Sequence, residues 1–528
     1  MSKYTIGLDF GTLSGRGILV DIENGNIIAQ CVKQYTHGVI DHHLSDGTLL
    51  PEGTALQDPM DYIEVLNTVI PSIIQGVDVN QIIGIGVDFT SCTMMPIDSF
   101  GIPLCIYDEY KGRKNSYVKL WKHHTAQKYA DRINSYLEEN NLKDHMAFGQ
   151  KVSCELMIPK IMETKEEDPD LYEKTYAFVE AGDYITFLLT NSLKRSLSFA
   201  GYKNFYDQGY QEDDFYKGLD LEGIKRKFPG LVIAPGTNIR DGGLCEKWAV
   251  ALGLKQGIAV SSAIIDSHAG VPASHITDEH EAMLVLGTSS VLIGLSKIPF
   301  SQNGIIGHVS GGIVPDYYAL ESGVAALGDL FQWFIENMVP YSYYQEAKKL
   351  ELSIYDYLNL KAEKLKDSQV IVLDYWNGNK TPYVRSDLKG AIYGLTIHTK
   401  CEEIYKAMIE ATAFSTKRIL EIYQKQNTAI EKIICSGSVA FNNPYLMQIY
   451  ADILNLPIYL VNCDQCAALG SAIYGAIASK AYDYKEAVEK MSKLKELVYL
   501  PDATQNLAYN ELYQQYLKYS ESYVEAVQ

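Results

Sequence analysis

The chain has 528 residues, of which 47% are hydrophobic and 21% charged, so it is long enough for two or more domains and has the composition of a soluble globular protein. Its net charge of −19, from 46 Lys and Arg against 65 Asp and Glu, disfavours nucleic acid as a partner. No run approaches the roughly 18 apolar residues of a membrane-spanning helix, and the N-terminus lacks a signal-peptide pattern. We therefore expect a cytoplasmic protein with no membrane partner.

The first part of the chain predicts an α/β domain. Three apolar segments separated by turns of glycine, asparagine and hydroxyl residues predict a meander of strands at residues 4–10, 15–21 and 27–35. Helical patterns follow at residues 59–75 and 115–139. Between them, the apolar run at residues 82–89 suits a central strand. Strands mixed with helices in this way indicate a layered α/β domain.

The strand–turn–strand pattern of the N-terminus recurs midway along the chain. Strands predicted at residues 282–286 and 291–296 flank the turn Gly287-Thr288-Ser289, much as Gly11 to Ser14 follows the first strand. Two like-built domains facing each other across a cleft would explain the recurrence, and coincidence between two short turns is the alternative.

The C-terminal part predicts further elements of the same kind. A long helix is expected at residues 402–425, followed by a strand at 431–435 and a small-residue turn at 436–438. Another helix should begin at Asn443-Pro444, with Asn as N-cap and Pro at the first helical position.

Asp9 is a carboxylate among apolar neighbours, directly before the Gly11 to Ser14 turn. Such a turn exposes backbone N–H groups and hydroxyls that can bind phosphate oxygens. A carboxylate at the end of the preceding strand can hold Mg²⁺, directly or through water. The sequence has no P-loop and no protein-kinase motif set. It therefore predicts a phosphate site of the hairpin type, with Asp9 as the metal ligand.

Several longer strings resemble the FGGY carbohydrate kinases, which belong to the sugar kinase, Hsp70 and actin superfamily. The most specific is Gly390-Ala-Ile-Tyr-Gly-Leu395 followed, after seven residues, by Glu403-Ile-Tyr-Lys-Ala-Met-Ile-Glu410, which is similar to the family's C-terminal signature. Within the family, the ribulokinase subfamily is suggested by three strings, DFTSCT at residues 88–93, KLWKHH at 119–124 and WNGN at 376–379. The resemblance covers essentially the whole chain.

The resemblance implies two actin-like (ribonuclease H-like) α/β domains with mixed sheets flanked by helices and a cleft between them. Residues 1–275 would bind the sugar and carry the phosphate and Mg²⁺ turn, and residues 276–528 would bind ATP. The implied reaction transfers the ATP γ-phosphate to the terminal hydroxyl of L-ribulose, with D-ribulose as a further acceptor, in L-arabinose catabolism. ATP and Mg²⁺ are the implied cofactors, the ketopentose is the implied small-molecule partner, and a homodimer is compatible with the family.

The resemblance also assigns roles to individual residues. Asp266 matches the general base that accepts the proton of the sugar hydroxyl, although the local sequence alone favours an N-cap aspartate. The implied sugar-binding residues are Ser91, Cys92, Thr93, Lys203, Asp266 and Glu321. The implied nucleotide-binding residues are Gly11, Thr12, Ser14, Arg16, Gly287, Thr288, Ser289, Gly437, Ser438 and Asn442.

Other interpretations are open at this point. The chain could phosphorylate another ketose or polyol, such as xylulose or glycerol, or be a non-catalytic sugar or nucleotide sensor on the same fold. The histidines His123, His124 and His268 have no nucleophile or metal-ligand spacing and are expected to be structural. The Cys463-Asp-Gln-Cys466 pair is weak evidence for zinc or redox chemistry, and small packing residues are the alternative.

Overall fold

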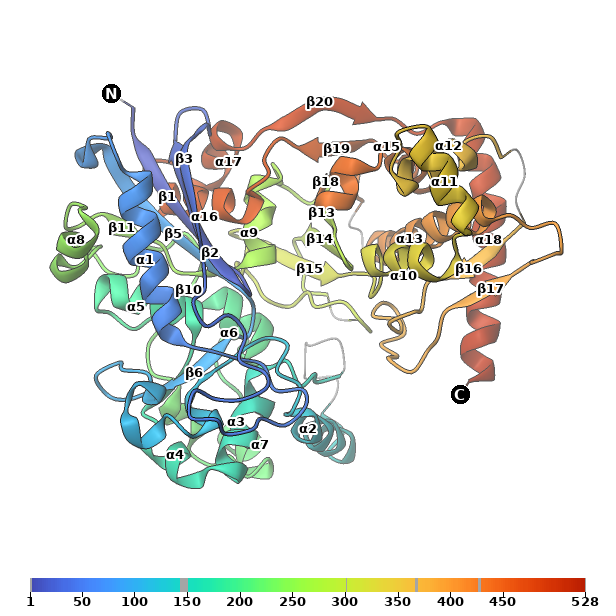
Figure 1. The fold of residues 1–528 in the computed structure, drawn as a ribbon. Helices are drawn as coiled ribbons and strands as arrows, with labels where there is room; N and C mark the ends of the chain where they lie inside the picture. Colours follow the sequence, from blue (N-terminus) through green and yellow to red (C-terminus); the bar gives the residue numbers. More distant parts are fainter. Residues whose placement is uncertain (1, 143–150, 301, 366–368, 426–428, 528) are drawn as a thin grey trace. The chain divides into compact units, whose positions relative to one another are not determined.

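The computed structural model describes residues 2–142, 151–300, 302–365, 369–425 and 429–527 (Figure 1). The chain divides into two compact units, which are described separately. Unit 1 comprises Met1–Thr277, His308–Ala319 and Cys463–Lys493, and unit 2 comprises Asp278–Gly307, Leu320–Asn462 and Leu494–Gln528. Within the described ranges, no helix has the length and apolar character needed to span a bilayer. That residues 1–275 bind the sugar and residues 276–528 bind ATP stays a prediction.

A mixed sheet forms the centre of unit 1, with strand order β11-β5-β1-β2-β3 and β12 paired with β5 (Figure 1). Its strands are β1 (Tyr4–Phe10), β2 (Ser14–Asp21), β3 (Ile27–Gln34), β5 (Ile82–Phe89), β11 (Ala259–Val260) and β12 (Ile264–Ile265). Strands β1, β2 and β3 form the predicted antiparallel meander, whereas β5 runs parallel to β1. The four strands predicted at residues 4–10, 15–21, 27–35 and 82–89 are thus confirmed.

Helix α1 (Pro59–Ile73) also confirms its prediction and is capped by the Asp58 side chain, which accepts from the Met60 N–H. The predicted helix at residues 115–139 is wrong over its first half, because only α2 (Gln127–Glu139) is an α-helix there. Residues Val118–Lys119 instead form strand β7. Fully buried Lys119 donates from Nζ to Glu163 Oε2 at 2.5 Å and to two further oxygens. This buried ion pair keeps the segment extended.

Helix α16 (Cys466–Ala478) lies directly against the centre of this sheet, although it comes from the C-terminal part of the chain (Figure 1). A Cβ atom on Gly7 would lie 1.9 Å from the Ala468 carbonyl oxygen, and one on Gly86 would lie 1.8 Å from that of Ser471. These distances are far below any real contact, so both positions require glycine. The backbones of α16, β1 and β5 therefore pack without intervening side chains.

Unit 1 contains additional elements. The helices are α3 (Met157–Glu167), α4 (Pro169–Lys174), α5 (Ala181–Thr190), α6 (Leu197–Lys203), α7 (Asp213–Gly218), α8 (Glu246–Leu252), α9 (Asp266–Ala273) and α17 (Tyr484–Met491). The strands are β4 (Leu56–Gln57), β6 (Met94–Ile97), β8 (Ala177–Glu180), β9 (Arg195–Ser196) and β10 (Val232–Ile233). Strands β4, β7, β6 and β8 make a second, four-stranded sheet, and β9 pairs with β10.

The sheet at the centre of unit 2 has the order β15-β14-β13-β18-β19-β20. Its strands are β13 (Glu281–Leu286), β14 (Ser290–Ser296), β15 (Tyr318–Ser322), β18 (Lys432–Ser436), β19 (Ile458–Val461) and β20 (Leu494–Tyr499). Strand β13 is antiparallel to β14 and parallel to β18, which repeats the relation of β1 to β2 and β5. The recurring Gly-Thr turns therefore occupy equivalent hairpins, and coincidence is excluded.

The helices of unit 2 confirm two further predictions. Helix α13 (Cys401–Gln424) matches the expected long helix. Helix α15 (Pro444–Leu454) begins as predicted, since Asn443 accepts from the Leu446 N–H and Pro444 is the first helical residue. The other elements are α10 (Gly328–Met338), α11 (Tyr341–Lys349), α12 (Ile354–Ala362), α14 (Ser438–Asn442), α18 (Ala503–Ala526), β16 (Ile371–Leu373) and β17 (Ala391–Tyr393).

Candidate active site

Three aspartates meet at one edge of the unit 1 sheet. Asp9 in β1 is the register partner of Asp88 in β5, and Asp266 directly follows β12, whose Ile264 is paired with Asp88. All three strands run parallel, so their carboxyl ends share one edge, which is where open α/β sheets bind ligands. The structure thus brings together the predicted metal ligand Asp9 and the predicted base Asp266.

Asp88 is a residue whose role the sequence interpretation missed. It lies in the tetrapeptide Gly86-Val-Asp-Phe89, which matches Gly7-Leu-Asp-Phe10 at three of four positions and pairs with it in register. The rings of Phe10 and Phe89 are stacked with centroids 5.2 Å apart. The repeated Gly-x-Asp-Phe pattern at the ends of two apolar strands was the signal that could have identified Asp88.

The surroundings of this acid pair favour a cation. Asp88 is fully buried, and its Oδ2 accepts from the Ser471 hydroxyl at 2.7 Å, while Oδ1 has no hydrogen-bond partner among the described residues. Burial raises the pKa of Asp88 well above its ordinary value, and the charge of Asp9 raises it further. Burial also raises the pKa of Asp9, opposed by Arg16, whose Nε lies 3.2 Å from Asp9 Oδ2.

These residues fit a weakly liganded Mg²⁺ better than a fully enclosed metal. No group of three His, Cys, Asp or Glu side chains in the described ranges could hold a metal ion by itself. Mg²⁺ usually takes one or two carboxylates and completes its shell with water and substrate phosphates. Asp9 and the orphaned carboxylate oxygen of Asp88 match that requirement.

Asp266 is the first residue of α9, and the N-cap position belongs to Ile265 rather than to Asp266. Its Oδ1 accepts from the Ser267 backbone N–H at 2.6 Å, so it does bind the helix start. The side chain is half-buried, and its negative charge contributes to the raised pKa of Asp88. Asp266 therefore interacts electrostatically with Asp88.

The turn after β1 is held by side chains from three other segments. Tyr35 donates from its hydroxyl to the Gly11 carbonyl at 3.0 Å, and Gln57 donates from Nε2 to the Thr12 carbonyl at 2.7 Å. Trp121 donates from Nε1 to the Thr12 hydroxyl at 3.2 Å. Ser14 closes the turn, since its carbonyl accepts from the Gly11 N–H at 2.9 Å. The predicted phosphate turn is thus rigidly supported.

The predicted sugar-binding residues of unit 1 lie near one another. Cys92 is buried with a left-handed φ of 52°, and its carbonyl accepts from Lys160 Nζ at 2.7 Å. Thr93 is buried and shares a hydrogen bond with Thr90, whereas Ser91 is half-buried. Lys203 ends α6 and is close enough to Cys92 to act on its pKa.

A buried hydrogen bond connects this region to the helix of the predicted base Asp266, and a further buried acid, Glu180, lies close enough to Lys203 for the lysine to act on its pKa. Ser198 of α6 shares a 3.0 Å hydrogen bond with His268 of α9, which links the helices that carry Lys203 and Asp266. Glu180 is fully buried, and neither of its carboxylate oxygens has a hydrogen-bond partner in the part of the chain that the structure describes. Burial raises the pKa of Glu180 to about 8, and Asp183 adds to the shift. No role for Glu180 was predicted from the sequence.

His123 has the contacts of a structural residue. His123 is buried, accepts from the Ala55 N–H at 3.2 Å and pairs with Glu163 Oε2 at 2.9 Å. Burial lowers the pKa of His123 to about 4. The KLWKHH segment thus builds a buried polar network around Glu163, and its Trp121 supports the phosphate turn.

In unit 2, the structure brings together two of the predicted nucleotide-binding segments. Gly437 has a φ of 98°, and a Cβ atom there would lie 2.3 Å from the Leu286 carbonyl, directly before Gly287. Helix α10 also begins on this turn, since the Gly328 N–H donates to the Gly287 carbonyl and the Leu327 N–H to that of Thr288. Ser289 closes the turn by accepting from the Gly287 N–H at 3.0 Å.

A cavity of about 450 Å³ opens beside these turns. Its lining includes the predicted residues Ser438 and Asn442, and the other lining residues are Gly328, Phe331, Ser353, Tyr355, Asp356, Val439 and Asn443. Ser438 is the first residue of α14 rather than part of a plain turn. Glu321 lies elsewhere, on β15, where its backbone pairs with that of Ile306.

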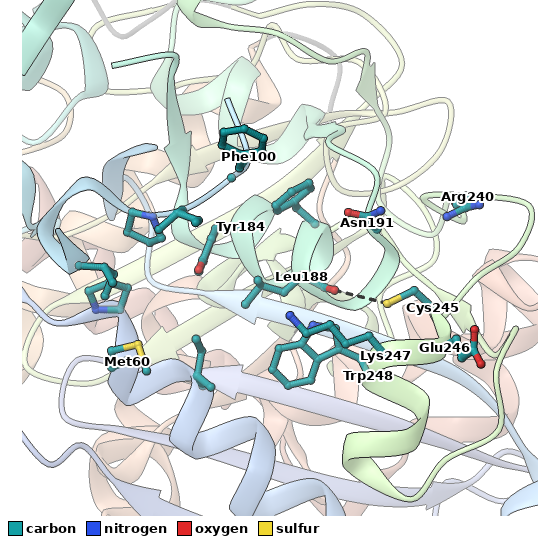
Figure 2. A pocket seen from close by; sticks show the side chains of 17 residues that line it. Met60, Phe100, Tyr184, Leu188, Asn191, Arg240, Cys245, Glu246, Lys247 and Trp248 are labelled. Carbon is teal, nitrogen blue, oxygen red and sulfur yellow. Dashed lines mark hydrogen bonds between the residues drawn. The ribbon is translucent and has the colours of Figure 1, made fainter. Parts of the chain in front are cut away.

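A different cavity, of about 540 Å³, lies in unit 1 (Figure 2). Its walls are mainly apolar and include Phe100, Tyr184 and Trp248. None of the predicted site residues lines it. The volume of a cavity therefore does not identify the candidate site in this molecule, whereas the cluster of Asp9, Asp88 and Asp266 does.

Known proteins share this fold and sequence. The N-terminal domain of the FGGY family of carbohydrate kinases matches residues 4–271, and its C-terminal domain matches residues 282–479. This chain belongs to the FGGY family of carbohydrate kinases. A ribulokinase from Bacillus licheniformis is 42% identical over 96% of this chain and 94% of that protein. A ribulokinase from Shouchella clausii is 40% identical over 98% and 95%.

Solved structures of other FGGY kinases confirm the two-domain α/β fold. Xylulose kinase from Rhodospirillum rubrum aligns with a TM-score of 0.81 at 20% identity, covering 98% of this chain and 99% of that one. Plasmodium falciparum glycerol kinase with ADP aligns with a TM-score of 0.79 at 18% identity, covering 98% of each chain. The solved structures show the shared fold, and the two family matches and the ribulokinase relatives show that the chain is a carbohydrate kinase.

Proposed function

We propose that this FGGY kinase transfers the γ-phosphate of ATP to the terminal hydroxyl of L-ribulose, giving L-ribulose 5-phosphate, and uses D-ribulose as a further acceptor. The observation that carries the proposal is the 40–42% identity to ribulokinases over more than nine-tenths of both chains. The clustered Asp9, Asp88 and Asp266 support an active kinase rather than a sensor. We place the reaction in the cytoplasm, in L-arabinose catabolism.

In this proposal, Asp266 accepts the proton of the attacking hydroxyl. Phosphoryl transfer has a loose transition state, so the protein mainly has to align the hydroxyl with the phosphorus and neutralise charge. The Ser267 N–H fixes the Asp266 carboxylate at the start of α9, so the proton acceptor has a defined position. The sugar hydroxyl that is bound beside this carboxylate is the one that it can deprotonate.

Asp9 holds Mg²⁺, and Arg16 and the supported turn Gly11 to Ser14 bind the phosphates. The metal, when bound, supplies charge neutralisation for the β- and γ-phosphate oxygens. Arg16 lies beside Asp9, and its positive charge offsets that of the carboxylate. In unit 2, Gly287 to Ser289 bind phosphate, and the cavity lined by Ser438 and Asn442 receives the adenosine.

Lys203, Ser91 to Thr93 and Glu321 provide donors and acceptors for the sugar hydroxyls. Fixed polar groups of this kind reject sugars that lack a matching hydroxyl, because the protein group is then left unpaired. The left-handed backbone at Cys92 and the buried Thr90–Thr93 pair keep that segment rigid. The choice of sugar thus depends mainly on residues other than Asp9 and Asp88.

A coupled ADP-release assay with L-ribulose, D-ribulose, xylulose and glycerol tests the proposal. We expect kcat/KM for L-ribulose to exceed that for xylulose and glycerol by at least tenfold. Activity with xylulose or glycerol alone would overturn the substrate assignment. Sugar binding without sugar-stimulated ADP release would overturn the proposed kinase reaction in favour of a sensor.

A further inference from the structure

Arg16 is held by two side chains that come from opposite ends of the chain. Its Nε lies 3.2 Å from Asp9 Oδ2, and its Nη1 donates to Gln465 Oε1 at 3.2 Å. Asp9 and Arg16 are cross-strand partners in the β1/β2 hairpin, whereas Gln465 directly precedes α16. The contact to Asp9 is an ion pair without a hydrogen bond from Nε, so Gln465 makes the hydrogen bond that fixes the guanidinium, and Nη2 has no hydrogen-bond partner among the residues that the structure describes.

The turn that presents Gln465 is shaped by the cysteines on either side of it. Cys463 Sγ accepts from the Gln465 backbone N–H at 3.3 Å, and Cys466 Sγ donates to the Cys463 carbonyl at 3.1 Å. Gln465 is also the N-cap residue of α16, and its carbonyl accepts from the Leu469 N–H at 2.9 Å. The two thiols thus stabilise the turn that contains Gln465, which gives the Cys-x-x-Cys sequence a structural role.

The position of this turn relative to Arg16 is fixed, because α16 packs tightly against β1, the strand that carries Asp9. Gly7 lies two residues before Asp9, and its backbone contacts that of Ala468, three residues after Gln465. Arginine is long and flexible, so holding it in one rotamer before the phosphate arrives removes an entropic cost from binding. A bidentate Arg–phosphate contact needs such an orientation.

We propose that Gln465 is a positioning residue that orients Arg16 so that its remaining edge faces a phosphate of the nucleotide. The inference rests on the proposed function, because it takes Arg16 as a phosphate-binding residue. A neutral amide suits this role better than a carboxylate, since a second acid beside Asp9 would cancel the charge that Arg16 offers to the phosphate.

The test is a double-mutant cycle on the full-length protein. We expect Gln465→Ala and the similarly sized Gln465→Met to raise KM for ATP by about 5- to 20-fold, with KM for the sugar unchanged within twofold. Gln465→Glu should keep the contact to Arg16 and still raise KM for ATP at least as much as Gln465→Ala. In an Arg16→Ala background, Gln465→Ala should have no further effect on KM for ATP.

Exposed Asp464→Asn, in the same turn, is the matched control and should leave both KM values at wild-type levels. A Gln465→Met protein with wild-type KM for ATP would overturn the inference. It would also be overturned if the Arg16→Ala and Gln465→Ala substitutions raised KM for ATP independently, so that the double variant showed the product of the two single effects. ATP affinity measured by calorimetry provides a second readout. If the wild type shows no sugar-dependent ADP release, the proposed function fails, and the calorimetric cycle with ATP alone still decides whether Gln465 acts through Arg16.

Discussion

Asp9, Asp88 and Asp266 show how three chemically identical side chains acquire different properties from their surroundings. Asp9 has Arg16 beside it, Asp88 is sealed between β5 and α16, and Asp266 accepts a hydrogen bond from the start of α9. Burial without a counter-charge favours the protonated form of a carboxyl, whereas a nearby cation favours the ionised form. These differences fit the proposal that Asp266, rather than Asp9 or Asp88, accepts the proton of the sugar hydroxyl.

Replacing Asp266 separates its chemical role from its contribution to the fold. Asp266→Asn preserves the shape of the side chain but removes its basicity, so we expect kcat to fall by about 10²- to 10⁴-fold. Sugar affinity should change by less than fivefold. Steady-state kinetics and sugar titration by calorimetry measure the two quantities, and a kcat within tenfold of wild type would contradict the assignment of Asp266 as the base.

Glu180 predicts a pH-dependent stability that can be measured independently of activity. Burial raises its pKa from 4.5 to about 8, so the native state holds a proton that the unfolded state releases above pH 4.5. Stability should therefore fall as pH rises from about 4.5 to 8. Glu180→Gln removes this penalty and should stabilise the protein increasingly across that window, by at most about 5 kcal/mol.

Thermal melts of the wild type and of Glu180→Gln from pH 5 to pH 8.5 measure the difference in stability between the two proteins. Half-buried Glu64→Gln is the control, because the hydrogen bond from Thr36 holds the pKa of Glu64 below its ordinary value, so the effect of this substitution on stability should stay constant between pH 5 and pH 8.5. A Glu180→Gln protein whose advantage is the same at all pH values would show that Glu180 is not protonated in the native state.

At the scale of elements, the sequence was informative wherever local pattern decides the structure. The strands of both hairpins, α1, α13 and the capped start of α15 followed from apolar periodicity, turn residues and helix caps. The structure of residues 115–126 could not be predicted in this way, because the charged residues of the buried Lys119–Glu163 pair resemble surface residues in the sequence. The docking of α16 on β1 and β5 could not be predicted either, since it joins residues hundreds of positions apart.

The glycine contacts between α16 and the sheet predict a sharp steric effect. In Gly86→Ala, the added Cβ would lie 1.8 Å from the Ser471 carbonyl, so α16 must move away from β5. We expect a loss of about 3 kcal/mol or more in the free energy of unfolding, and reduced activity because Gln465 moves with α16. Gly209→Ala is the control, since a Cβ there has no atom within 4 Å.

Urea unfolding of the two variants measures the difference. A Gly86→Ala protein as stable as the Gly209→Ala protein would show that α16 does not pack closely on Gly86.

At the scale of the whole molecule, unit 1 is not a continuous stretch of the chain. The segment Cys463–Lys493 supplies α16 and α17, and α16 covers the backbones of β1 and β5. A fragment of residues 1–275 lacks this cover and exposes apolar sheet surface to water. The sequence indicated two like-built halves, but it could not show that the first is completed by residues near the end of the chain.

Expression of residues 1–275 alone therefore should give a protein that lacks a cooperative thermal transition. Adding a peptide of residues 463–493 should increase its ellipticity and restore a transition, because the peptide contains the missing helix. Circular dichroism melts of the fragment with and without the peptide measure this, with a scrambled peptide as control. A cooperative transition in the fragment alone would contradict the proposed dependence on α16.

The late position of α16 also has a consequence during translation. Roughly 380 residues separate the end of β5 from the start of α16, so at about 5 to 20 residues per second the ribosome needs about 20 to 75 s to add the helix. The central strands of unit 1 leave the exit tunnel long before their covering helix exists. The nascent chain is thus expected to depend on chaperones that shield β1 and β5 until synthesis is almost finished.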